Sequence, residues 1–301
     1  MSPTKTHTTT ELMLLLMLAT FWGASYTFIR IGVATIPPIT LITARTLIAG
    51  SILFAVVRWR GLALPRDPAI WRRFLIQACL NSVIPFTLIA WAERTVDAGL
   101  ATILNSTTPI FTFLLAAILF RNELVTARKL FGIAMGLTGI CFIIGFDALN
   151  GFGQQLPAQL AVVAASICYA GAALFGRNFK HLDPMMPAVG SLLCGAVMLI
   201  PVSLLVDRPW TLTPAFPSII ALLALAVLST ALAFSIYFRL IQTLGPIGTT
   251  AQGYLRVPIG VTIGVVFLGE PVTPTAGIGL VCVIVGVMAM TMTSRKKAVR
   301  G

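Results

Sequence analysis

The chain has 301 residues, of which 57% are hydrophobic and only 10% are charged, and its formal net charge is +12. Soluble domains contain about 25% charged residues, so this composition excludes a soluble globular protein. The basic residues lie in short segments between apolar runs, which is typical of membrane orientation and excludes a nucleic-acid-binding face.

The apolar runs predict ten membrane-spanning helices, since a helix needs about 20 apolar residues to cross a bilayer. In chain order they are 12–33, 38–57, 74–92, 98–120, 128–146, 157–178, 185–206, 215–238, 246–268 and 273–293. Prolines stand at several breaks, as in Pro37-Pro38 and Gly245-Pro246, where they disfavour continuation of a helix. The expected fold is an all-α membrane protein.

The second half of the chain repeats markers of the first half about 147 positions later. The corresponding pairs are Trp22 and Tyr169, Arg30 and Arg177, Pro37 and Pro184, Glu123 and Glu270, Gly132 and Gly279, and Gly139 and Gly286. Two five-helix units would produce this pattern, and because five is odd the second unit is inverted. Inverted repeats enclose a site near the bilayer midplane that can face either side of the membrane.

The distribution of lysine and arginine predicts the orientation. With the N-terminus inside, 16 basic residues lie in inner segments and 3 in outer segments, as the preference for cytoplasmic positive charge requires. Both termini are therefore expected in the cytoplasm. The expected organisation is a cytoplasmic tail 1–11, a first repeat 12–146, an external linker 147–156, a second repeat 157–293 and a basic cytoplasmic tail 294–301.

Several short motifs mark both halves. They are Trp22-Gly23 in the first span, residues 104–109 (LNSTTP) followed by Arg121-Asn122-Glu123, and in the second half Val257-Pro258 and residues 268–271 (LGEP). The chain resembles the drug/metabolite transporter superfamily, EamA type, over about residues 10–293. The resemblance implies a ten-helix bundle with a central cavity, in the bacterial inner membrane, that moves small organic molecules, often outward. The second half has Tyr169-Ala170 where the first has Trp22-Gly23, so the side-chain roles need not be symmetric.

Two arginines interrupt the apolar runs. Arg45 lies about seven residues into the second predicted span, and Arg256 about ten residues into the ninth. A lipid-facing arginine costs on the order of 3 kcal/mol, so both are expected to face a wet cavity and to pair with an anionic substrate group such as a carboxylate. The alternatives are snorkelling of Arg45 to the outer interface and a structural contact of Arg256 with a carbonyl or with Asn105.

Polar clusters precede prolines in the fourth and ninth predicted spans. A proline frees the carbonyl four residues before it, and nearby hydroxyls and amides can satisfy that carbonyl or bind a ligand. The alternative role of such clusters is helix–helix packing. The substrate-binding candidates from the clusters are Asn105, Thr108, Gln252 and Tyr254.

Aromatic and amide side chains extend the candidate cavity. Trp22 and Tyr169 occupy equivalent mid-span positions and are expected to form apolar walls, with interfacial anchoring as the alternative. Gln77 and Asn81 lie one turn apart in the third predicted span and complete the substrate-binding candidates.

Acidic residues are absent from the middles of the predicted spans, so no buried carboxylate relay is visible. Coupling to protons would have to use Glu93, Asp97 or Glu270 at a cavity mouth; otherwise the protein would be an exchanger or a facilitator. The five cysteines form no CxxC pair, and no nucleotide-binding motif occurs. We expect no enzymatic activity, no catalytic residue, no metal and no cofactor.

The function expected is secondary transport of a small amphipathic metabolite, such as an amino acid or its derivative, by alternating access and with net efflux. The alternatives are an importer of a vitamin-like metabolite such as riboflavin and a non-transporting membrane scaffold. The expected partners are a small-molecule substrate and the lipid bilayer. Glycine-rich patterns in the fifth and tenth predicted spans favour close helix packing, either within the chain or in a homodimer.

Overall fold

The computed structural model describes residues 5–96, 101, 104–105, 107–119, 126–144, 156–259 and 274–291. Within these ranges the chain is helical, with no strand, as the apolar runs predicted. Six described helical segments are long and apolar enough to cross a membrane. They are Thr9–Val33, Pro38–Trp59, Pro68–Ala92, Leu156–Phe179, Met185–Val206 and Phe216–Thr243.

These six segments are built from continuous helices or from helices joined by short π-helical or 3-10 turns. The helices are α1 (Lys5–Val33), α2 (Pro38–Trp59), α3 (Pro68–Ala78), α4 (Ile84–Ala92), α8 (Leu156–Phe175), α9 (Met185–Val206), α10 (Phe216–Ala226) and α11 (Ala233–Thr243). The third segment begins at Pro68, six residues before the predicted start at 74, because Asp67 accepts a hydrogen bond from the Ala69 amide (2.8 Å) and Pro68 suits the first helical turn.

Parts of the four other predicted spans are also helical. They are α6 (Thr108–Leu119), α7 (Ala127–Ile144), α12 (Gly245–Thr250) with helical residues 252–259, and α14 (Pro274–Thr291). Asp97, Ser106, Glu123, Glu270, most of the linker 147–156 and the tail 294–301 lie outside the described residues, as does the whole motif 268–271.

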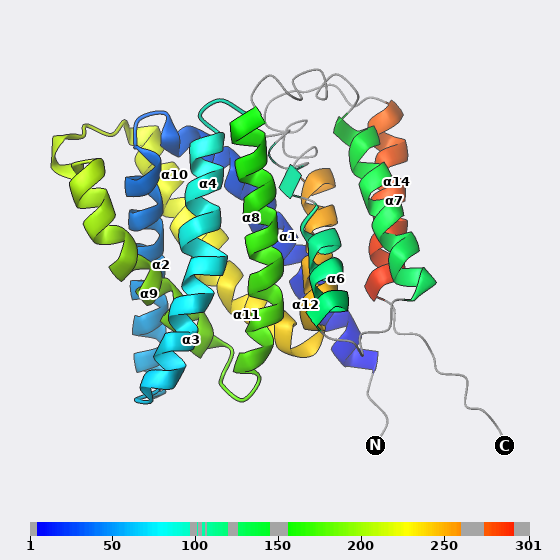
Figure 1. The fold of residues 1–301 in the computed structure, drawn as a ribbon, viewed down its shortest axis with the longest axis horizontal. Helices are drawn as coiled ribbons and strands as arrows, with labels where there is room; N and C mark the ends of the chain where they lie inside the picture. The colour runs from blue at the N-terminus through cyan, green and yellow to red at the C-terminus, as the bar shows by residue number, and fades with distance from the viewer. Residues whose placement is uncertain are drawn as a thin grey trace.

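Equivalent helices of the two halves run in opposite directions. In Figure 1, α1 starts at the lower side of the bundle, whereas its counterpart α8 starts at the upper side; α2 runs downward and its counterpart α9 runs upward. The contacts between the halves also come in equivalent pairs. Each of α2 and α7 packs on its own counterpart, α9 and α14. In addition, α4 packs on α8, and the counterparts of that pair, α10 with α11 and α1, pack on each other. Each half is therefore held by the other half through matching helices.

A π-helical turn interrupts the third long helix of each half. The turn η1 (Cys79–Val83) lies between α3 and α4, and the turn η5 (Val227–Leu232) lies between α10 and α11. Pro85 follows η1 and cannot donate a backbone hydrogen bond, while in η5 the Thr230 hydroxyl donates to the Leu225 carbonyl (2.7 Å). The register of the repeat places the two turns at corresponding positions, about 147 residues apart.

Glycines bring α7 and α14 into backbone contact. A Cβ atom added at Gly286 would lie 2.7 Å from the Gly132 carbonyl oxygen and 2.8 Å from the Gly136 nitrogen. This confirms the close packing predicted for these glycines and places it within one chain. Homodimer formation stays a prediction.

Candidate functional site

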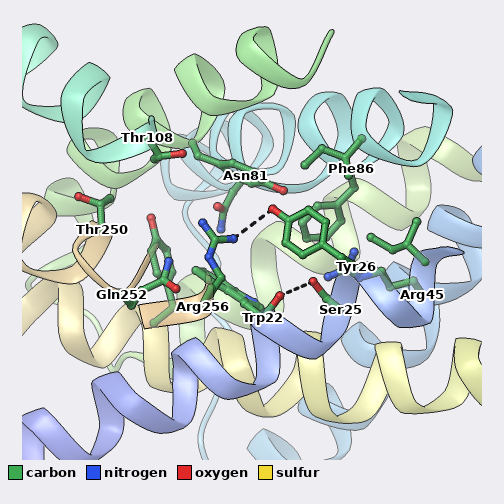
Figure 2. Close-up of a pocket in the computed structure, with 14 residues that line it drawn as sticks. Trp22, Ser25, Tyr26, Arg45, Asn81, Phe86, Thr108, Thr250, Gln252 and Arg256 are labelled. Atoms are coloured by element: carbon green, nitrogen blue, oxygen red, sulfur yellow. Dashed lines mark hydrogen bonds between the residues drawn. The ribbon is translucent and has the colours of Figure 1, made fainter. Parts of the chain in front are cut away.

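One cavity lies between the two halves, at the level of the π-helical turns (Figure 2). It contains about 590 Å³ of space not occupied by protein atoms, its open mouth included. Side chains from both halves line it. The 14 lining residues are Trp22, Ser25, Tyr26, Ile29, Arg45, Asn81, Phe86, Ile89, Thr108, Tyr169, Tyr237, Thr250, Gln252 and Arg256.

Arg45 projects from α2 and is held by the second half of the chain. Its Nε donates to the Thr230 hydroxyl (2.6 Å), its Nη2 donates to the Ser229 carbonyl (3.4 Å), and its guanidinium lies 3.7 Å from the centroid of the Phe86 ring. The residue is only 2% exposed, so it does not snorkel to an interface. Its charge is therefore kept inside the protein by hydrogen bonds and by the aromatic face.

Arg256 projects from the second half and is held by the first. Its Nη2 donates to the Asn105 amide oxygen (2.9 Å), and its Nη1 donates to the Tyr26 hydroxyl (3.3 Å). The contact with Asn105 was the structural alternative for this arginine, and it coexists with a position in the cavity lining. Figure 2 shows the Tyr26 ring between Arg256 and Arg45.

The charge of the cavity lining is one-sided. Two of the 14 lining residues are arginines, and none of these 14 is acidic. Several buried polar atoms at or beside the cavity also have no hydrogen-bond partner among the described residues. They are Arg256 Nε, Asn81 Nδ2, Asn105 Nδ2 and Gln252 Oε1. Three of these four atoms are donors, so the site has the chemistry to bind an anionic group.

Aromatic rings form the walls of the cavity. The Trp22 ring lies 5.4 Å from the Tyr237 ring, and the Phe86 ring lies 6.3 Å from the Tyr169 ring, measured between centroids. Trp22 Nε1 donates to the Ser229 carbonyl (3.0 Å), which fixes α1 against η5. The walls can therefore contact an apolar body while the arginines contact a charged group.

Seven of the ten residues predicted from the sequence line this cavity. They are Trp22, Arg45, Asn81, Thr108, Tyr169, Gln252 and Arg256. The other three are buried outside the lining. Asn105 contacts Arg256, Gln77 donates to the Ala172 carbonyl (3.3 Å), and Tyr254 packs against Gly136.

The candidates chosen from the sequence omitted half of the lining. Ser25, Tyr26 and Ile29 follow Trp22 at helical spacings of three, four and seven, so they share its face of α1. Phe86 and Ile89 share a face of α4 in the same way. The periodicity around Trp22 was the signal that could have found the residues on α1.

Glu93 lies beside this site, directly after the last residue of α4. Its side chain is fully buried, and neither carboxyl oxygen has a hydrogen-bond partner among the described residues. Its backbone carbonyl accepts a hydrogen bond from Arg30 Nη1. Burial raises the pKa of the Glu93 carboxyl well above its usual value, although Arg30 and, to a smaller degree, Arg45 act in the opposite direction.

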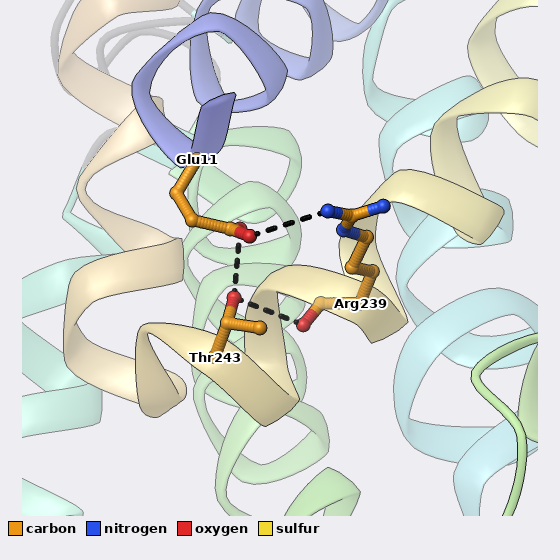
Figure 3. Close-up of polar contacts among 3 residues, drawn as sticks. All are labelled: Glu11, Arg239 and Thr243. Carbon is orange, nitrogen blue, oxygen red and sulfur yellow. Dashed lines mark hydrogen bonds and ion pairs between the residues drawn. The ribbon is translucent and has the colours of Figure 1, made fainter. Parts of the chain in front are cut away.

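A second buried glutamate, Glu11, has an ion-pair partner and a hydrogen-bond donor for its carboxylate. Its carboxylate pairs with Arg239 (3.5 Å) and accepts a hydrogen bond from the Thr243 hydroxyl (2.8 Å), as Figure 3 shows. These contacts join the beginning of α1 to the end of α11. Glu11 therefore closes the contact between two helices at the end of α1 that is remote from Arg30.

Comparison with known proteins relates this architecture to membrane transporters. The chain is similar to the uncharacterized inner membrane transporter YedA of Escherichia coli (26% identical over 90% of this chain and 87% of the relative). It is also similar to the uncharacterized transporter YoaV of Bacillus subtilis (25% identical; 92% and 95% covered). A third relative is the "Probable amino-acid metabolite efflux pump" of Salmonella typhimurium (27% identical; 91% and 92% covered).

A solved crystal structure shares the fold, with a TM-score of 0.78, 17% sequence identity and coverage of 95% of this chain and 99% of that one. The profile of the EamA-like transporter family matches the sequence twice, at residues 9–145 and 156–292. Both matches include the residues that carry the repeated markers. The chain, a multi-pass membrane protein, therefore belongs to the EamA-like transporter family.

Proposed function

We propose that this protein is a secondary transporter for small amphipathic metabolites that carry a carboxylate, such as amino acids and their derivatives. The observation that carries the proposal is the cavity between the two halves, whose 14 described lining residues include no acid and in which Arg45 and Arg256 face aromatic walls. Buried arginine binds a carboxylate with charge-assisted hydrogen bonds. The aromatic walls supply contact area for an apolar body.

Transport would proceed by alternating access, with one half rocking against the other around this cavity. The complete protein would have ten spans in two inverted units, 12–146 and 157–293, joined by a periplasmic linker at 147–156 and flanked by cytoplasmic tails. The opposite directions of α1 and α8 support this arrangement. Net efflux across the bacterial inner membrane is supported by the name of the Salmonella typhimurium relative.

Seven of the ten residues predicted from the sequence line the cavity, and they would bind the substrate in three groups. Arg45 and Arg256 would bind the carboxylate, while Asn81, Thr108 and Gln252 would bind further polar groups. Trp22 and Tyr169 would contact the apolar body. Asn105, Gln77 and Tyr254, which do not line the cavity, would act by supporting the helices and side chains that do.

Transport into proteoliposomes tests the proposal with three labelled probes of one skeleton: phenylalanine, N-acetylphenylalanine and phenylalanine amide. The expected result is exchange of the two probes that carry a carboxylate and none of the amide. Equal exchange of the amide would show that the arginines do not select the substrate.

A parallel experiment compares the medium of cells that lack or overproduce the protein. Overproduction is expected to raise the external level of at least one amphipathic carboxylate. An unchanged set of external metabolites, together with no exchange of any probe in liposomes, would overturn the transporter proposal.

A further inference from the structure

The Glu93 carboxyl is a buried group that the binding of a carboxylate does not use. It follows the end of α4, close to the cavity residue Ile89, and its side chain is fully shielded from solvent. Neither oxygen finds a donor among the described residues. Burial of an unpaired ionised carboxylate is strongly unfavourable, whereas burial of a protonated carboxyl is much less so.

The comparison with Glu11 shows that burial alone does not leave a carboxyl group without a partner. Glu11 is also buried, yet it pairs with Arg239 and Thr243 and so has partners for its charge. Glu93 has two arginines in its neighbourhood, but Arg30 donates to the backbone carbonyl of Glu93 instead, and Arg45 donates to Thr230 and Ser229. The nearby cations therefore leave the Glu93 carboxyl without a direct contact.

Within the part of the chain that the structure describes, the titratable and charged groups on the helices packed around Glu93 come from three elements. On α1 they are Arg30 and Tyr26, on α2 Arg45, and on α8 Tyr169, whose ring packs against Phe86 of α4. Arg45 belongs both to this group and to the cavity lining. It is therefore the element through which the charge of Glu93 can act on a bound ligand.

We propose that Glu93 is the proton-binding group of this protein, and that its protonation is coupled through Arg45 to the binding of an anion in the cavity. The coupling rests on the proposed function, whereas the proton site does not. With Glu93 neutral, the positive charge of Arg45 is available to the anion. With Glu93 ionised, the carboxylate competes with the anion for the same positive charge.

The sign of the coupling follows from this competition. Proton binding strengthens anion binding, and by reciprocity anion binding strengthens proton binding. One proton and one monoanion would then cross together, so the cycle moves no net charge. An outward gradient of the metabolite would drive both out, and a proton gradient directed inward would drive both in.

Infrared spectroscopy of the full-length protein in phosphatidylethanolamine–phosphatidylglycerol vesicles tests the proton site without a substrate. The spectrum at neutral pH is expected to contain a protonated-carboxyl band that disappears as the pH rises and is missing in Glu93→Gln. The matched control is Glu11→Gln, which removes the other glutamate that is buried among the described residues and is expected to keep the band. A Glu93 that is ionised throughout about pH 5 to 9 would overturn the proton site.

The same titration measures the coupling. Arg45→Gln is expected to move the midpoint of the Glu93 band to higher pH by about one unit, because a nearby positive charge is lost. Saturating N-acetylphenylalanine is expected to move it in the same direction. A midpoint that Arg45→Gln leaves in place would overturn the coupling. If only N-acetylphenylalanine fails to move it, this probe does not bind in the cavity, which counts against the proposed function and leaves the proton site standing.

Transport measurements give a second test of the coupling between proton and anion. One proton per monoanion predicts about tenfold accumulation of N-acetylphenylalanine for each unit of pH difference, acid outside. Glu93→Gln is expected to abolish this accumulation, and the apparent affinity of the variant for the anion no longer falls with rising pH. Accumulation by Glu93→Gln equal to that of the unmodified protein would overturn the proton-coupling role.

Discussion

Arg45 and Arg256 line the same cavity but are built into the protein in different ways. Arg45 has two hydrogen bonds to η5 and lies against the Phe86 ring, so its guanidinium joins α2 to the opposite half. Among the described residues the guanidinium of Arg256 donates hydrogen bonds to two side chains, Tyr26 and Asn105, and its Nε has no partner. In the proposed function, Arg256 would be the main ligand of a substrate carboxylate, whereas Arg45 would combine binding with support of the fold.

Arg256→Ala is expected to have the largest effect on transport. Loss of a charge-assisted hydrogen bond costs about 1.5–3 kcal/mol, which corresponds to about 10- to 150-fold weaker binding of carboxylate probes. Expression and thermal stability are expected to stay close to those of the unmodified protein. The measurement is concentration-dependent exchange of N-acetylphenylalanine in proteoliposomes, with Arg256→Lys as the charge-preserving control. Unchanged exchange in Arg256→Ala would remove this residue from the site.

Arg45→Ala is expected to weaken both transport and the fold. The substitution removes one of the largest fully buried side chains among the described residues and leaves the Thr230 hydroxyl without this donor, so we expect a loss of about 2–4 kcal/mol in the free energy of unfolding. Thermal denaturation in detergent measures it beside Arg256→Ala. Equal stability of the two variants would contradict the idea that Arg45 supports the fold more than Arg256 does.

Thr230→Val removes a support of Arg45 and keeps the charge of Arg45; it also removes the hydrogen bond from the Thr230 hydroxyl to the Leu225 carbonyl. The 2.6 Å hydrogen bond from Arg45 is lost while the guanidinium remains, so a destabilisation of about 1–2 kcal/mol is expected. The control is Thr20→Val, which removes an exposed hydroxyl that bonds only within α1. Denaturation midpoints that do not differ between the two variants would show that the contact with Thr230 contributes nothing to stability.

Tyr26→Phe is expected to have the smallest effect. It removes the 3.3 Å contact that positions Arg256, and a single neutral donor or acceptor contributes about 0.5–1.5 kcal/mol. The apparent affinity for carboxylate probes should fall about two- to tenfold, with stability unaffected. Tyr237→Phe, which changes another tyrosine of the lining, serves as the control. A larger loss in the control would mean that ring polarity in general, and not the position of Arg256, sets the affinity.

Helix content and the inverted halves follow from the sequence because membrane burial requires long apolar runs, and such runs are visible without a structure. The predicted bounds of α9, 185–206, coincide with those observed. The arginines were found for the same reason, since a charge at bilayer depth is costly wherever it occurs.

The details of the cavity depend on helix rotation, which apolar runs do not specify. Gln77 and Asn81 lie one turn apart, yet only Asn81 lines the cavity, because η1 changes the helical register between them. Tyr254 has a polar tip and a position near Pro258, yet its ring fills the space above Gly136. Packing between helices that are distant in the sequence decides which of these side chains line the cavity, and residue spacing within one helix does not reveal it.

The matched positions of η1 and η5 bear on the ancestry of the protein. A π-helical turn contains an inserted residue, and two separate insertions at the same register of two halves would require a coincidence. A single insertion in an ancestral five-helix unit, before that unit was duplicated, explains both turns. The backbone irregularity would then be older than Arg45 and Arg256, whose positions have no arginine counterpart in the other half. Substrate chemistry would have been added later to a hinge-like turn that both halves already possessed.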